Sequence, residues 1–130
     1  MFGRKGESTP HARIDTLIGA GTQVEGNIRF AGGLRIDGVV KGNVEVAEGA
    51  AASMLVLSEQ ARVEGEVVVA HLVTNGTIVG RVAVTESLEM QARAKIVGDV
   101  EYSLIEMHQG AVVEGRLIHP VAELAELKPA

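Results

Sequence analysis

The sequence predicts an all-β fold, a single-stranded β-helix of about six turns flanked by disordered termini. Three observations predict it: a short motif that recurs six times, apolar columns that appear when its copies are aligned, and the composition. The 130 residues include 16 glycines but only two phenylalanines, one tyrosine and no tryptophan, so the core must be aliphatic. Abundant valine and isoleucine with glycine favour strands and tight turns over helices.

The recurring motif is V-x-G-x-V, and each copy centres on one glycine. The six copies read V-E-G-N-I (24–28), V-K-G-N-V (40–44), V-E-G-E-V (63–67), I-V-G-R-V (78–82), I-V-G-D-V (96–100) and V-E-G-R-L (113–117). Their glycines are Gly26, Gly42, Gly65, Gly80, Gly98 and Gly115, spaced by 16, 23, 15, 18 and 17 residues. A period near 18 is too short for a self-contained unit, and it fits one coil of a β-helix with about three short strands.

Alignment on these glycines gives columns of like residues. The positions two before and two after each glycine are always aliphatic, and the position directly after it is always polar, as the two sides of a strand should be. A further apolar column, eight residues before each glycine, contains Ile18, Leu34, Leu57, Leu72, Met90 and Met107. We interpret the glycines as inward strand positions, for example in A-K-I-V-G-D-V-E-Y (94–102), where a narrow tube leaves room for backbone only.

The parts of the chain follow in order. Residues 1–14 are polar and lie outside the repeat, so we expect a disordered arm. Residues 15–119 form the β-helix, and the long spacing between 42 and 65 contains A-E-G-A-A-A-S-M (47–54), which we expect to loop out from a turn. Residues 120–130 form a short tail between two prolines, with at most one or two helical turns.

Charge and composition exclude several function classes. The arm carries about +2 and the remainder about −7, and an acidic body without interleaved aromatic and basic residues does not predict nucleic-acid binding. The absence of cysteine excludes disulfides and thiolate metal sites. No apolar run approaches about 20 residues and the N-terminus lacks the apolar core of a signal peptide, so we expect the protein to stay in the cytoplasm.

An enzyme is the main alternative. Left-handed β-helices also use 18 residues per coil, and such folds serve as trimeric acyltransferases and zinc carbonic anhydrases. Catalysis there would need a histidine base or a cluster of histidine ligands, but His71, His108 and His119 fall in three different columns. Gly19-Ala20-Gly21 also lacks the further glycine and lysine of a phosphate loop. We therefore expect no catalytic, metal or cofactor site, and no nucleotide.

The repeats carry a resemblance to a known family. The polar arm, the V-x-G-x-V repeats over residues 15–119 and the overall size resemble the bactofilins, bacterial cytoskeletal proteins. The resemblance implies a right-handed β-helix that assembles end to end into nonpolar filaments without nucleotide. It also implies a scaffold on the inner face of the cytoplasmic membrane that positions client proteins such as cell-wall enzymes and helps to set cell shape.

The ends of the predicted β-helix are candidate polymer contacts. A β-helix ends in open turns, and it stacks on another chain unless something caps it. We expect the first turn to present Leu17, Ile18, Val24, Ile28 and Phe30, and the last to present Met107, Val113 and Leu117. If the two tails folded over these ends, the chain would instead be a monomeric adaptor.

The start of the arm is a candidate membrane-targeting peptide. It reads M-F-G-R-K-G, and Met1 and Phe2 stand beside the cations Arg4 and Lys5. Burial of Phe2 could contribute roughly 2 kcal/mol, and each cation about 1 kcal/mol near anionic lipid. Members of the resembled family that bind membranes use a similar peptide, and repetition along a filament would make such a weak contact avid.

Overall fold

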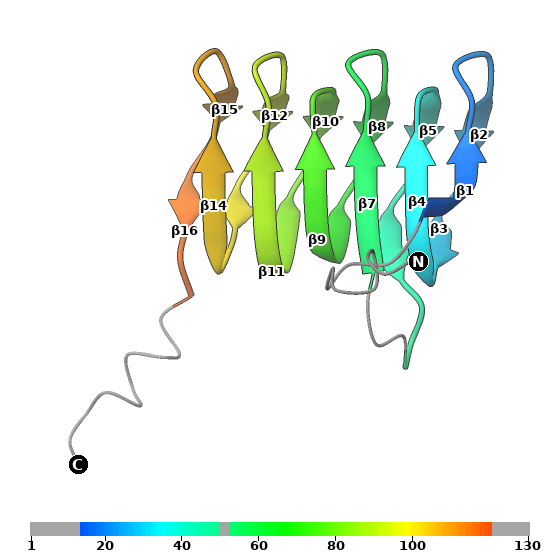
Figure 1. Ribbon diagram of the computed structural model, residues 1–130, viewed down its shortest axis with the longest axis horizontal. Coiled ribbons are helices and arrows are strands. Elements are labelled where there is room, and N and C mark those ends of the chain that lie inside the picture. The colour runs from blue at the N-terminus through cyan, green and yellow to red at the C-terminus, as the bar shows by residue number, and fades with distance from the viewer. Residues whose placement is uncertain (1–13, 50–52, 121–130) are drawn as a thin grey trace, which may run out of the picture.

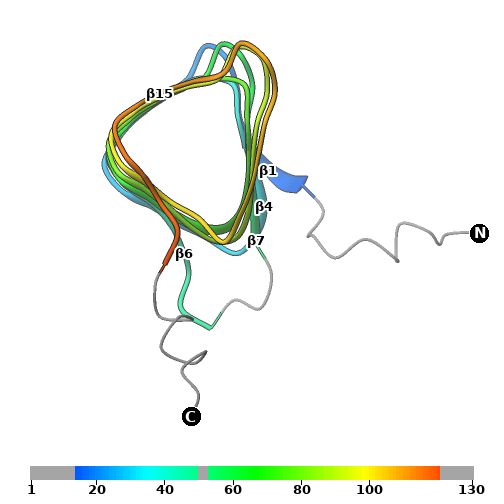
Figure 2. The ribbon, with the colours of Figure 1, turned by 90° about the vertical axis from the view of Figure 1, so that its left-hand side faces the viewer.

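The structure is a computed structural model that describes residues 14–49 and 53–120. These residues form 16 short strands and no helix, and every paired strand is parallel to its neighbour. The strands wind into six turns of a tube that is triangular in cross-section (Figures 1 and 2). The predicted β-helix is therefore confirmed.

Each side of the triangle is a stack of parallel strands, and every turn adds one rung to each stack. The first and third faces together make a ten-stranded sheet, and the second face is a six-stranded sheet. The first face contains β1 (Ile14–Ile18), β4 (Gly32–Ile36), β7 (Ser53–Leu57), the second half of β9 (Val67–Thr74), the second half of β11 (Val82–Met90) and β14 (Leu104–Met107). The second face contains β2 (Gln23–Glu25), β5 (Val39–Lys41), β8 (Arg62–Glu64), β10 (Thr77–Val79), β12 (Lys95–Val97) and β15 (Val112–Glu114). The third face contains β3 (Ile28–Phe30), β6 (Val44–Val46), the first halves of β9 and β11, β13 (Val100–Glu101) and β16 (Leu117–Ile118).

The winding is right-handed. In Figure 1 the strands of the first face run upward at the front while the chain advances from right to left. In Figure 2 the C-terminal turns face the viewer, and the chain passes from the first face at the right to β15 at the upper left, which is counter-clockwise. A chain that turns counter-clockwise as it approaches the viewer forms a right-handed helix.

The core is a set of aliphatic stacks along the axis. Each face contributes a column of side chains that are at most 1% exposed and lie in direct register across neighbouring turns. The columns are Leu34–Leu55–Leu72–Leu88 on the first face, Val40–Val63–Ile78–Ile96 on the second and Val44–Val67–Val82–Val100 on the third. Because parallel strands stack about 4.8 Å apart, the same residue types can repeat through the whole tube.

One predicted column is wrong in its register. The column eight residues before each glycine mixes two real stacks, because Leu34 and Leu72 align with Leu55 and Leu88, whereas Leu57 and Met90 align with Ile36 and Thr74. The turns differ in length at their corners, so a fixed count slips by two residues. A slip of two residues keeps a side chain on the same side of a strand. The column therefore still contains only inward-facing residues, although it mixes two stacks.

The glycine of each motif lies at a corner and not inside a strand, contrary to the prediction. β12 ends at Val97, and β13 begins on the next face at Val100, so Gly98 and Asp99 make the bend between them. Gly98 has a φ of 146°, and a Cβ there would collide with the carbonyl oxygen of Gly80 one turn earlier. Positive φ and close backbone stacking both require glycine at this corner.

The long motif spacing is accommodated outside the strands, as predicted. β6 ends at Val46 and β7 begins at Ser53, and Figure 2 shows the chain leaving the triangular outline after β6. Residues 47–49 are not in a strand, and residues 50–52 of the expected loop lie outside the described residues. The arm and tail expected from the sequence, residues 1–14 and 120–130, also lie outside the described residues, except for Ile14 and Pro120.

Candidate functional site: the two ends of the solenoid

The end turns differ from the others in their backbone pairing. Each strand of the four middle turns pairs on both sides. Among residues 14–49 and 53–120, the strands of the first turn (β1, β2, β3) and of the last turn (β14, β15, β16) pair on one side only. An open strand edge with free N–H and C=O groups is a template for pairing with another chain. The solenoid therefore presents two such edges, one at each end of the rod in Figure 1.

The C-terminal end combines this edge with an apolar cross-section. The predicted contact residues Met107, Val113 and Leu117 all point inward and stack on side chains one turn earlier, Met90, Ile96 and Val100. Those three partners are fully buried, whereas Met107 is 40% and Leu117 47% exposed. The sequence analysis missed Ile105, which stacks on Leu88 in the same way. Counting one turn forward from Leu88 in the correct register would have found it.

At the N-terminal end the predicted residues occupy different positions. Ile18, Val24 and Ile28 are half-buried and pack against the core from one side, as expected for an open end. Phe30 is only 8% exposed and is already a core residue. Leu17 is 60% exposed, but it aligns with Arg35 and points outward from the first face, because strand residues alternate between the two sides.

The membrane-targeting prediction falls outside the described residues. Met1, Phe2, Arg4 and Lys5 all precede residue 14. Within the described part of the chain, no helix is long and apolar enough to cross a bilayer.

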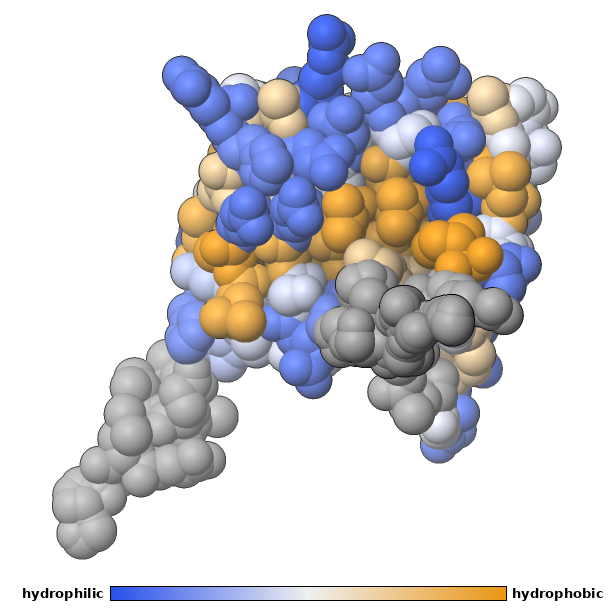
Figure 3. Space-filling model, viewed as in Figure 1, coloured by the Kyte–Doolittle hydropathy of each residue, from blue (hydrophilic) through white to orange (hydrophobic). Residues whose placement is uncertain are grey.

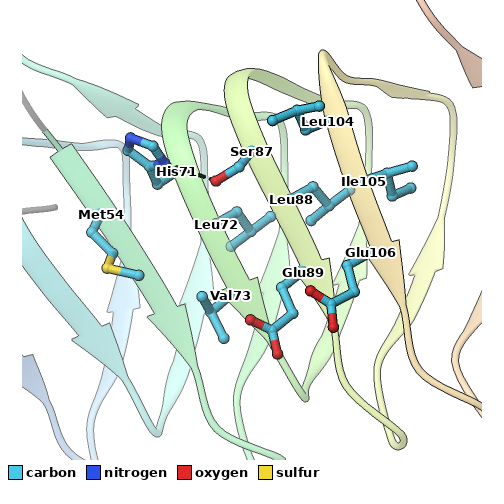
Figure 4. A pocket seen from close by; sticks show the side chains of 10 residues that line it. All are labelled: Met54, His71, Leu72, Val73, Ser87, Leu88, Glu89, Leu104, Ile105 and Glu106. Carbon is cyan, nitrogen blue, oxygen red and sulfur yellow. Dashed lines mark hydrogen bonds between the residues drawn. The ribbon is translucent and has the colours of Figure 1, made fainter. Parts of the chain in front are cut away.

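The first face carries a shallow groove of about 380 Å³ on its outer side. Apolar side chains gather over the middle of this face (Figure 3), and Figure 4 shows the groove with His71 and Ser87 on adjacent strands. His71 Nδ1 and Ser87 Oγ are 2.8 Å apart. A serine nucleophile needs a base that a third group orients, and no carboxylate in the described part of the chain contacts His71. The pair therefore lacks the third member of a catalytic set.

Side chains at one corner of the triangle bond successive turns together. Near the N-terminus, the Asn27 and Asn43 amide oxygens accept hydrogen bonds of 2.9 Å from backbone N–H groups of the next turn. In the same column near the C-terminus, Arg116 donates to Asp99 through its guanidinium at 2.8 Å and its backbone N–H at 3.0 Å. These two hydrogen bonds hold the pKa of Asp99 below its ordinary value. The last turn is thus tied to the fifth at this corner.

Comparison with known proteins identifies a family. A family model described as "Bactofilin: Polymer-forming cytoskeletal" matches residues 16–118. Two similar proteins from Myxococcus xanthus are Bactofilin BacP, 24% identical over 85% of this chain and 45% of its own length, and Bactofilin BacO, 24% identical over 88% of this chain and 90% of its own. The chain therefore spans about half of BacP and most of BacO.

No solved structure matches the chain significantly. The family match covers most of the chain, from the first strand of the solenoid to the last. The chain belongs to the bactofilin family of polymer-forming cytoskeletal proteins.

Proposed function

We propose that this chain is a non-enzymatic scaffold whose filaments form by end-to-end stacking of the solenoid. The observation that carries the proposal is the open C-terminal end, where an unpaired strand edge surrounds the exposed inward residues Met107 and Leu117. Stacking a second chain there would pair the free backbone groups and bury both side chains. Their burial favours association, because removing apolar surface from water contributes about 25 cal/mol per Å².

The experiment is negative-stain electron microscopy with light scattering on the purified chain, without nucleotide. Wild type should form filaments. Leu117→Arg places a charge in the stacked cross-section and should abolish long filaments. Thr85→Arg adds the same charge to an exposed position at mid-rod, so filaments should persist. Unchanged filaments in Leu117→Arg would rule out the C-terminal end as a contact.

The same variant tests the polarity of the filaments. The resemblance to the bactofilins supports nonpolar filaments, in which like ends meet. In that arrangement Leu117→Arg blocks one kind of contact and leaves the other, so the protein should stop at dimers. In a polar filament every contact joins an N-terminal to a C-terminal end, and the same variant would be monomeric. Light scattering distinguishes a dimer from a monomer directly.

We also propose that the filaments lie on the inner face of the cytoplasmic membrane and position client proteins such as cell-wall enzymes. The apolar and basic start of the arm, with Phe2 next to Arg4 and Lys5, supports the membrane part. Phe2→Ser should reduce co-sedimentation with vesicles of phosphatidylglycerol and phosphatidylcholine, and pure phosphatidylcholine vesicles serve as the control. Equal binding of wild type and Phe2→Ser would exclude this peptide as the anchor. The client proteins are proposed from the family resemblance alone.

A further inference from the structure

Three side chains of types that can bind a metal ion lie close together near the ends of β11 and β14, the last two strands of the first face. Glu89 is on β11, Glu106 is on β14, and His108 directly follows β14. His108 Nε2 is 3.1 Å from Glu89 Oε2 and 3.3 Å from Glu106 Oε2, and one ligand atom of each residue lies within 4.8 Å of the others. Figure 4 shows the two carboxylates side by side on adjacent strands.

These separations match the edges of a tetrahedral zinc site. With metal–ligand bonds of about 2.0–2.1 Å, two ligands of a tetrahedron are about 3.3 Å apart. The two distances from His108 already have this value. The ligand atoms of the two carboxylates lie within 4.8 Å of one another, and the Glu106 side chain, which is 70% exposed, has room to rotate toward the common centre. A water molecule would complete four ligands.

The placement of the two glutamates gives an independent reason for a cation. Glu89 and Glu106 are direct register partners on neighbouring parallel strands, and like charges directly opposite each other are destabilising. In the part of the chain that the structure describes, His108 is the sole basic side chain that reaches either carboxylate. The amide of Gln91, 3.5 Å from Glu89, adds no charge. A bound cation would offset the repulsion between the two carboxylates.

We propose that Glu89, Glu106 and His108 bind a divalent transition-metal cation, of which Zn²⁺ fits best. The donor set excludes Ca²⁺ as the preferred ion, because Ca²⁺ takes six to eight oxygen ligands, whereas one imidazole with two carboxylates suits zinc. The bound cation joins β11 to β14 and so fastens the last turn to the fifth. The sequence predicts no metal site because His71, His108 and His119 fall in different columns, whereas this cluster combines one histidine with two glutamates from two turns.

Binding is tested with the full chain, stripped of metal with EDTA and titrated with ZnCl₂ in a calorimeter. Wild type should bind one Zn²⁺ per chain, and His108→Gln and Glu106→Gln should each weaken binding by at least about tenfold. Two matched controls should leave the affinity unchanged. Glu86→Gln removes an exposed carboxylate from the same strand β11, and His119→Gln removes an imidazole beyond the end of β16.

Two further readouts report on the site, and the second is measured at a concentration where light scattering shows monomers. Co²⁺ in place of Zn²⁺ should give the intense visible absorption of a four-coordinate site in wild type and lose it in His108→Gln. Amide hydrogen exchange in β14 should slow when Zn²⁺ binds, because the cation fastens this strand to β11. All variants change exposed side chains, and circular dichroism checks that they remain folded.

Two results would overturn the proposal. If wild type takes up no Zn²⁺ at millimolar concentration, His108 serves only as a hydrogen-bond partner of the two glutamates. If His108→Gln and Glu106→Gln bind Zn²⁺ as tightly as wild type, the cation binds elsewhere on the chain. Neither result depends on whether the rods assemble.

Discussion

The fifth and last turns of the solenoid have the same design and different surroundings. Val100 and Leu117 occupy one inward column, and Met90 and Met107 occupy another. Val100 and Met90 are fully buried, whereas Leu117 is 47% and Met107 40% exposed. The fifth turn has a further turn beyond it, and among the described residues the last turn has none. Burial in this fold is thus supplied by the next turn, and in the proposed filament another chain would provide that turn for each end.

The glycine corners give the strongest contrast between a middle turn and an end turn. At Gly80 an added Cβ would collide with the Gly65 carbonyl, and φ is 147°. Gly26 has a φ of 135°, but an added Cβ would meet nothing within 4 Å. Gly80→Ala should therefore lower the free energy of unfolding by on the order of 3 kcal/mol, and Gly26→Ala by about 1 kcal/mol, from backbone strain alone.

The measurement is urea unfolding followed by circular dichroism, at a concentration where light scattering shows monomers. Equal losses in the two alanine variants would show that φ alone determines the need for glycine. That result would remove the close stacking of turns as an explanation for the repeated motif.

The methionine column gives a second contrast between a middle turn and an end turn. Met90→Ala empties a fully buried position and should lower the free energy of unfolding by about 2–4 kcal/mol. Met107→Ala removes a side chain that is 40% exposed and should cost the monomer less than about 1 kcal/mol. In filaments, however, Met107 would be covered. Met107→Ala should then raise the protein concentration needed for filaments, as measured by sedimentation, and an unchanged concentration would contradict burial of Met107 in the contact.

The sequence predicted the architecture well because its signal repeats. Six copies of one motif averaged out the errors of any single copy, and the inward or outward position of a side chain survives a counting error of two residues. The corners could not be predicted in the same way. V-x-G-x-V continues the alternation of a strand and so predicts Gly98 inside a strand, although its positive φ is that of a bend.

The side-chain contacts between successive turns could not be predicted from the sequence. His71 meets Ser87 at a separation of 16 residues, and Glu89 aligns with Glu106 at a separation of 17. Since turn length varies along the chain, a fixed period does not tell which residues become neighbours. The cluster at Glu89, Glu106 and His108 becomes visible only when the register of the last two turns is known.

The smallest expected effect concerns the Asp99–Arg116 pair, which ties the last turn to the fifth. The hydrogen bonds from Arg116 lower the pKa of Asp99 below its ordinary value near 3.8. A lowered pKa means that the stabilising contribution is fully present above the ordinary value and is lost as the pH falls through the lower, folded value. The protection factors of the β16 amides, which correct for the intrinsic pH dependence of exchange, should therefore fall below about pH 4 in wild type, and Asp99→Asn should already show lower protection at neutral pH.

Glu64 provides the matched comparison in a middle turn. Its pKa is also lowered, chiefly by the hydrogen bond from Arg62, but both residues belong to β8 and their pair joins no turns. Glu64→Gln should therefore leave exchange in β16 unchanged at neutral pH. If Asp99→Asn behaved like Glu64→Gln, the corner pair would contribute nothing to holding the end turn. The order of that turn would then depend on its backbone pairing and apolar stacking alone, the same interactions that an incoming chain would extend.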